Sequence, residues 1–118
     1  MEYHTAKQIE DIAKVCHEAN RAYCETQNDP SQVEWNKAEK WQKDSAILGV
    51  KFNLDNPAAP ASSSHDCWLA EKKKEGWKYG KIKDAVKKTH PCYVPYGDLP
   101  VFQQKKDLLF KRVVNALR

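Results

Sequence analysis

Residues 64–96 read SHDCWLAEKKKEGWKYGKIKDAVKKTHPCYVPY, and the interpretation of the whole chain starts from this stretch. It joins tryptophans, tyrosines and histidines to a run of lysines. Eight lysines and only two acidic residues lie between Lys72 and Lys88, and such a local excess of positive charge attracts phosphate groups. Flat rings beside fixed positive charge suit a ligand that carries an aromatic base and a phosphate. The same residues equally suit the core and the solvated rim of a small domain.

The hydrophobic pattern predicts a mainly α-helical fold of about four helices with short extended segments. Thr5 with Gln8 forms the expected capping box before the first helix, and Ser63 with Asp66 resembles a capping pair before the third. Gly76 is expected to end the third helix. Extended segments are expected over residues 77–82 and 90–96. The expected helices cover residues 6–27, 37–55, 64–75 and 100–117.

Apolar residues recur at helical spacing on three of these helices. Gly49 interrupts the second helix and indicates close packing at that point, while Trp35 lies in a short linker before it. The expected apolar faces comprise Ile9, Ile12, Ala13, Cys16, Ala19, Asn20 and Tyr23 on the first helix, Trp41, Ala46, Ile47, Val50 and Leu54 on the second, and Phe102, Leu108, Leu109, Phe110, Val113, Val114 and Leu117 on the last.

Length and composition favour one folded domain over residues 1–118. The chain has 118 residues, of which 41% are hydrophobic and 31% charged, a globular rather than a disordered composition. No apolar run approaches the length of a membrane span, so we expect no membrane association. The net charge of +4 is modest for a protein that binds nucleic acid duplexes. The opening residues lack a signal-like apolar stretch and the four cysteines are widely spaced, so we expect reduced thiols and a cytoplasmic protein.

The histidines and cysteines do not show the spacing of a metal site or of a nucleophilic enzyme. His65 precedes Cys67 by two residues, and His90 precedes Cys92 by two, but the chain has neither Cys-x-x-Cys nor His-x-x-x-His. Neighbouring pairs such as Cys16-His17 do not face each other on a helix. We therefore expect no metal, no cofactor and no catalytic activity.

Trp68 and Lys72 are the strongest candidates for ligand contacts. They are four residues apart on the third predicted helix and point the same way, which pairs a stacking surface with a cation. Lys83 follows the turn after Gly80 and can approach the same place. Considered without any resemblance, Trp68 is more simply a core residue. Tyr79 is likewise favoured as core, although it completes the predicted ligand-binding set together with His90.

Several ordered motifs resemble the ryanodine receptor repeat, or RyR domain. They are His65-Asp66-Cys67-Trp68, Gly76-Trp77-Lys78-Tyr79-Gly80, Lys83-Asp84, His90-Pro91-Cys92 and Val94-Pro95-Tyr96. The resemblance extends from about Thr5 to Leu117 and is nearest to stand-alone bacterial and phage versions. It implies a non-enzymatic, mainly helical binding module. In the calcium release channels these modules occur in tandem pairs, and the first pair is associated with adenine-nucleotide binding between tryptophans at the position of Trp68.

The resemblance implies an adenine-nucleotide-like ligand, with Trp68 stacking the base and Lys72 and Lys83 meeting the phosphates. This chain has one copy of the repeat, so a two-sided cleft requires a homodimer, which we expect. Lysines stand where the receptors commonly have arginines, which removes bidentate phosphate recognition. The alternative is a protein–protein interaction module without a small ligand, in which the same aromatic residues are packing.

The purified protein should carry no stoichiometric zinc, because its Cys and His spacings do not form a closed tetrahedral site. Elemental analysis of protein purified without chelators measures this directly. One zinc per chain that disappears in Cys67→Ser would contradict the prediction.

Overall fold

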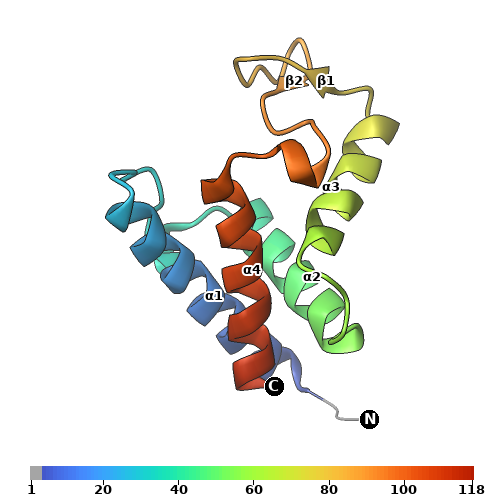
Figure 1. Ribbon diagram of the computed structural model, residues 1–118. Coiled ribbons are helices and arrows are strands. Elements are labelled where there is room, and N and C mark those ends of the chain that lie inside the picture. The colour runs from blue at the N-terminus through green and yellow to red at the C-terminus, as the bar shows by residue number, and fades with distance from the viewer. Residues whose placement is uncertain (1–3) are drawn as a thin grey trace. The chain divides into compact units, whose positions relative to one another are not determined.

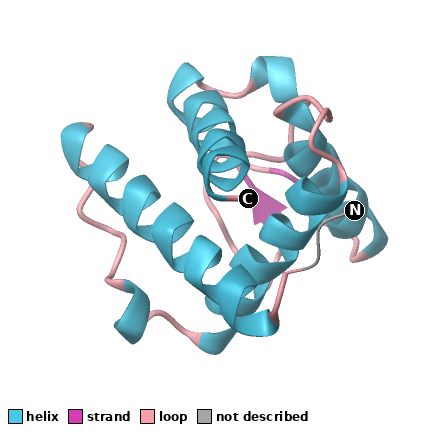
Figure 2. Ribbon diagram, turned by 90° about the horizontal axis from the view of Figure 1, so that it is seen from below, coloured by secondary structure: helices cyan, strands magenta, loops and turns pink. Residues whose placement is uncertain are grey.

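The computed structural model describes residues 4–118, and this part of the chain is mainly helical, as predicted (Figures 1 and 2). Strands β1 and β2 pair in parallel, with Lys78 opposite Thr89 and Tyr79 opposite His90. The elements are α1 (Ala6–Thr26), the 3₁₀ turn η1 (Trp35–Lys37), α2 (Lys40–Asp55), α3 (Ser62–Lys74), β1 (Lys78–Tyr79), β2 (Thr89–His90), the 3₁₀ turn η2 (Tyr96–Asp98) and α4 (Val101–Leu117).

Contacts between Cα atoms divide the chain into two units. The first comprises the chain up to Ala59 together with Leu108–Arg118, and the second comprises Pro60–Asp107. The helix α4 therefore begins in the second unit and continues into the first. The single domain over residues 1–118 stays a prediction.

The helix α1 begins at the predicted capping box. The Thr5 Oγ1 accepts a hydrogen bond from the Gln8 backbone N–H at 3.1 Å, and the Gln8 Oε1 accepts one from the Thr5 N–H at 2.8 Å. Two backbone donors that have no partner inside the helix are satisfied in this way. The helix ends at Thr26, one residue before the predicted end, and Asn28 follows in the left-handed region with φ 61°.

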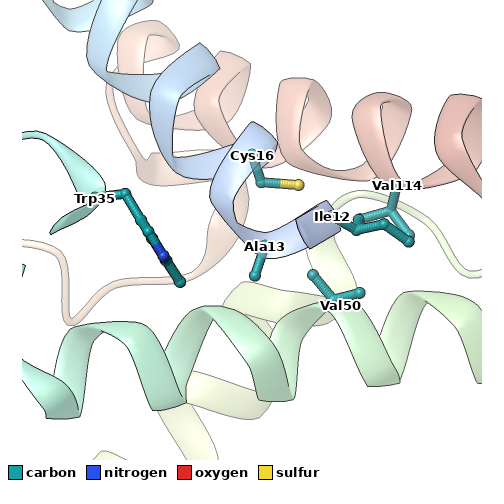
Figure 3. Close-up of a cluster of buried hydrophobic side chains, with 6 residues drawn as sticks. All are labelled: Ile12, Ala13, Cys16, Trp35, Val50 and Val114. Atoms are coloured by element: carbon teal, nitrogen blue, oxygen red, sulfur yellow. The ribbon is translucent and has the colours of Figure 1, made fainter. Parts of the chain in front are cut away.

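The core of the first unit joins α1, α2, η1 and the end of α4 (Figure 3). Trp35 belongs to this core, although the sequence places it in a linker. Its ring lies edge-on to His17, with 5.6 Å between the ring centroids. The buried cluster consists of Ile12, Ala13, Cys16, Trp35, Val50 and Val114.

The predicted apolar face of α2 is wrong at Trp41. The helix begins at Lys40 rather than residue 37, because Ala38 and Glu39 are extended. Trp41 is 64% exposed, and its Nε1 donates a hydrogen bond to the Glu39 carboxylate at 2.5 Å. It lies nine residues from the buried Val50, which at 3.6 residues per turn is about 180° around the helix. The remaining predicted residues, Ala46, Ile47 and Leu54, pack against the core.

Gly49 lies where α2 approaches Phe110 of α4, which confirms the predicted close packing. A Cβ atom at this position would be 3.0 Å from the Phe110 Cζ. Glycine therefore allows the aromatic ring to lie directly against the α2 backbone.

The helix α3 begins at Ser62, so the predicted cap at Ser63 is wrong. The Ser63 N–H donates to the Pro60 carbonyl at 3.0 Å, and Ala61 is already helical without a side-chain cap. The turn that starts at Pro60 thus continues directly into the helix, and the serines lie within its first turn.

The C-terminal end of α3 is a Schellman motif, as Gly76 predicts. Gly76 has φ 84°, its N–H donates to the Lys73 carbonyl at 3.1 Å, and the Trp77 N–H donates to the Lys72 carbonyl at 2.9 Å. Glycine adopts this left-handed conformation without the clash that a Cβ atom causes. The motif brings Trp77 back beside Lys72.

Truncation of Val50 tests the core assignment. Val50 is fully buried, so Val50→Ala should lower the free energy of unfolding by about 2 kcal/mol through lost burial and a residual cavity. Leu48 lies on the same helix and is 66% exposed, so Leu48→Ala should change it by less than about 0.5 kcal/mol. Urea denaturation measures both, and equal losses would contradict the assignment.

Candidate functional site

A pocket of about 310 Å³, partly open to solvent, lies within the second unit. Ser64, His65 and Trp68 reach it from α3. His90 and Cys92 line it from the end of β2 and the following turn, while Leu99, Gln103 and Asp107 line it from the end of the η2 segment and the start of α4.

Trp68 is half-buried and forms part of the pocket wall. The His65 ring stacks on it with a centroid separation of 5.5 Å and an interplanar angle of 21°. The His90 ring approaches at 4.9 Å and 72°. Trp68 is thus supported by two imidazoles and still borders open space.

His65 is a pocket residue that sequence reasoning missed, because its spacing to Cys67 was considered only for a metal site. It is buried, and its Nε2 lies 2.7 Å from the Val94 carbonyl oxygen. A carbonyl only accepts, so Nε2 carries the hydrogen and donates it. The available signal was its spacing, since a residue three positions before Trp68 lies on the same helical face.

His90 lies at the end of β2, and its ring is held in the neutral form. Its Nδ1 accepts a hydrogen bond from the Cys92 N–H at 3.0 Å, so this nitrogen carries no proton. Burial lowers the pKa of His90 below 6.5, and the nearby positive charges of Lys83 and Lys72 lower it further, as does His65. His90 is therefore a neutral wall of the pocket at pH 7.

Lys72 lies between the rings of Trp68 and Trp77. Its Nζ is 4.7 Å from the centroid of Trp77 and 5.9 Å from that of Trp68, distances at which a cation is attracted to the ring face. The Glu75 carboxylate is 3.7 Å from the same Nζ. The predicted pair of Trp68 and Lys72 is therefore close together in the structure, although Lys72 lies beside the pocket rather than in its lining.

The other two predicted residues are farther from the pocket lining. Lys83 is exposed and close enough to His90 to influence its pKa. Tyr79 is 54% exposed and opposes His90 in the strand pair. The structure therefore brings Trp68, Lys72 and His90 together, places Lys83 near them and leaves Tyr79 outside the lining.

Asp107 is a second pocket residue that the sequence did not indicate. Burial raises the pKa of its carboxyl, while His65 and Lys106 oppose that shift. It is four residues after Gln103 on α4, so the two side chains share one face. Their spacing was visible in the sequence, but nothing local showed that this face lines a pocket.

Cys16 and Cys92 are not activated as nucleophiles. Burial raises the pKa of Cys16 to about 12 and also raises that of Cys92, so both thiols remain protonated and unreactive at pH 7.

Within residues 4–118, no group of three or more His, Cys, Asp or Glu side chains is arranged to hold a metal ion. No helix in the described part of the chain is long and apolar enough to cross a membrane.

The lowered pKa of His90 predicts a pH-dependent stability. The pKa of His90 is higher in the unfolded chain than in the folded protein, so protonation of His90 favours unfolding. The contribution of neutral His90 to the free energy of unfolding is therefore complete above pH 6.5 and declines as the pH falls. In His90→Asn the side-chain oxygen can still accept from the Cys92 N–H, but nothing titrates. The unfolding free energy of the wild type should therefore fall faster than that of the variant below pH 6.5. Parallel urea-denaturation curves over this range would contradict the prediction.

The second unit contains all of the motifs that resemble the RyR domain. The RyR domain family matches residues 57–118, just over half of the chain, which is shorter than the extent from Thr5 expected from sequence resemblance. The match contains the whole second unit and therefore the pocket with Trp68 and His90. The chain belongs to the RyR domain family.

Proposed function

We propose that this chain is a non-enzymatic binding module that takes an adenine-nucleotide-like ligand in the pocket beside Trp68. The observation that carries the proposal is the position of Trp68, which lines an open pocket while Lys72 holds a positive charge 5.9 Å from its ring. A sealed tryptophan would be available only for packing. This one combines a supported ring with solvent access.

The pocket has the dimensions and the wall for one aromatic base. Its volume of about 310 Å³ lies at the lower end of the range for small-molecule sites. His65 stacks against Trp68 and fixes the ring, which lowers the entropy cost of ordering it on binding. A base would stack on the part of Trp68 that borders the pocket, with His90 as a neutral flank.

The phosphates would lie toward Lys72 and Lys83. The Lys72–Glu75 contact, at 3.7 Å, involves a carboxylate with 53% side-chain exposure, and partly exposed pairs of this kind are weak. A phosphate can therefore compete for Lys72. Lys83 has no ion pair with any residue of the described chain and would add a second charge. Tyr79 lies opposite His90 in the strand pair, outside the pocket lining.

The expected homodimer would cover the outer side of the bound base. The pocket lining of a single chain contains one tryptophan, Trp68, and the His65 ring already stacks on that ring. A second copy would then provide the other stacking surface. We also propose that the module works in the cytoplasm, without membrane or nucleic-acid partners.

The alternative function, a protein-interaction module, is favoured by a different observation. Ile82 is 78% exposed, Val86 is 93% exposed and Tyr79 is 54% exposed. All three lie within residues 78–88, a segment that also contains several lysines. Exposed apolar side chains that occur together can indicate a protein contact, and this one would not require the pocket.

Removal of the Trp68 ring tests the ligand site. Calorimetric titration with AMP, ADP and ATP should show binding to the wild type, and Trp68→Ala should weaken it by about 1–3 kcal/mol, the contribution of one stacked base. Trp41→Ala is the matched control, because Trp41 is 64% exposed in the other unit. Melting curves of both variants separate lost affinity from lost structure. If the wild type binds no nucleotide and Trp68→Ala has a strongly lowered melting temperature, the ligand site is overturned. The protein-interaction module would then be the remaining function.

The phosphate contacts are tested through salt dependence. Lys72→Ala and Lys83→Ala should weaken ATP binding more at low than at high ionic strength, because salt screens exposed charges. Lys51→Ala removes an exposed lysine from α2 in the first unit and serves as the control. Equal effects of all three substitutions would show that only net charge matters.

A further inference from the structure

The pocket contains two polar side chains that the described part of the chain leaves without partners. Asp107 and Gln103 both line it, and no residue from 4 to 118 forms a side-chain hydrogen bond or an ion pair with either of them. The neighbouring Gln104 differs, since its amide donates to the Leu99 carbonyl at 2.9 Å. The two unpartnered groups thus face the space that a ligand would fill.

Asp107 is partly buried and borders a pocket that is partly open to solvent. Burial is the largest influence on its pKa and raises it, although His65 and Lys106 favour the charged form. A carboxylate that loses water without gaining a donor is destabilised. A donor on a ligand would supply the missing interaction, and hydrogen bonds to charged groups are among the stronger ones.

The charges around the pocket are also separated. Asp107 lies on the side formed by α4, whereas Lys72 lies at the end of α3 beside Trp77. A phosphate near Asp107 would meet a like charge, while one near Lys72 would meet an opposite charge. Although Lys106 also lies near Asp107, this arrangement favours the orientation with the phosphate toward Lys72 and the base edge toward Asp107.

We infer that Asp107, assisted by Gln103, selects bases that carry an exocyclic amino group. The inference rests on the proposed nucleotide-binding function and adds a specificity-determining residue to it. The amino group donates to the Asp107 carboxylate, and the Gln103 amide pairs with a neighbouring ring nitrogen. A base with a carbonyl in place of the amino group would direct an acceptor at a carboxylate and would bind less well.

The test compares three ligands that differ at C6 of the purine, where the amino group of adenine is attached. They are AMP, inosine monophosphate, and purine riboside monophosphate, which has hydrogen at C6. Inosine monophosphate also carries a hydrogen on the adjacent N1. Calorimetric titration of the wild type should show AMP binding about tenfold more tightly than the other two, as expected for one hydrogen bond to a charged group. In Asp107→Asn the preference over inosine monophosphate should fall to within about threefold, because an amide can donate to the carbonyl.

The ratio of affinities is the informative quantity. Replacing Asp107 removes a negative charge and strengthens binding of every phosphate ligand, but this effect cancels in the ratio. Asp98→Asn makes the same change at an exposed residue of the same unit, outside the pocket lining, and should retain the wild-type preference. Lys72→Ala should weaken all three ligands equally.

The outcomes separate this inference from the proposed function. Equal wild-type affinities for AMP and inosine monophosphate would overturn the selection by Asp107 and leave nucleotide binding intact. An unchanged ratio in Asp107→Asn would do the same. No binding of any of the three ligands would overturn both. Loss of all binding in Asp107→Asn with a lowered melting temperature would show a structural role and would also overturn the inference.

Discussion

The hydrogen bond from the His65 Nε2 to the Val94 carbonyl is the interaction on which the second unit depends. It spans 2.7 Å between residues 29 positions apart and ties α3 to the segment that follows β2. The carbonyl acceptor fixes the imidazole tautomer, and its direction fixes the plane of the ring. The ring therefore presents a flat face to Trp68. One buried imidazole therefore contacts both the segment and the tryptophan.

Helix geometry explains why one helix carries most of the site. His65, Trp68 and Lys72 are separated by three and then four residues, so they lie along one face of α3. The Schellman motif then reverses the chain at Gly76 and returns Trp77 to the same face, where Lys72 lies 4.7 Å from its ring. The series of imidazole, indole and ammonium is thus a property of local geometry. The lining residues outside α3, which are His90, Cys92, Leu99 and the α4 residues, arrive through tertiary contacts.

The same distinction explains how much could be predicted from the sequence. The helices, the Thr5 capping box and the end of α3 at Gly76 depend on neighbouring residues, and they were predicted within a few positions. Trp68 and Lys72 were paired for the same reason. Trp41 was misplaced although its spacing of nine residues from Val50 puts the two side chains on opposite sides of any helix that contains both. This error could have been avoided from the sequence alone.

Contacts between residues far apart in the sequence could not be predicted from local patterns. The partner of His65 is Val94, and nothing near either residue indicates the other. Asp107 and Gln103 belong to an amphipathic helix whose apolar side contributes Val114 to the core of the first unit. Val114 lies seven residues after Asp107, on the same face of the helix. Periodicity therefore identified the apolar part of this face, but it could not show that the polar residues at its start line a pocket. The family resemblance supplied the motifs of the second unit but not their contacts.

The polar lining is a stronger indication of a ligand than the tryptophan is. Stability alone can account for Trp68, because a half-buried indole that contacts two imidazoles is favourable in the absence of any ligand. The cation between two indoles can be explained in the same way. Asp107 has no such explanation, since a partly desolvated carboxylate without a donor costs stability. Under the proposed function, a donor on the ligand would supply the hydrogen bond that this carboxylate lacks in the free protein.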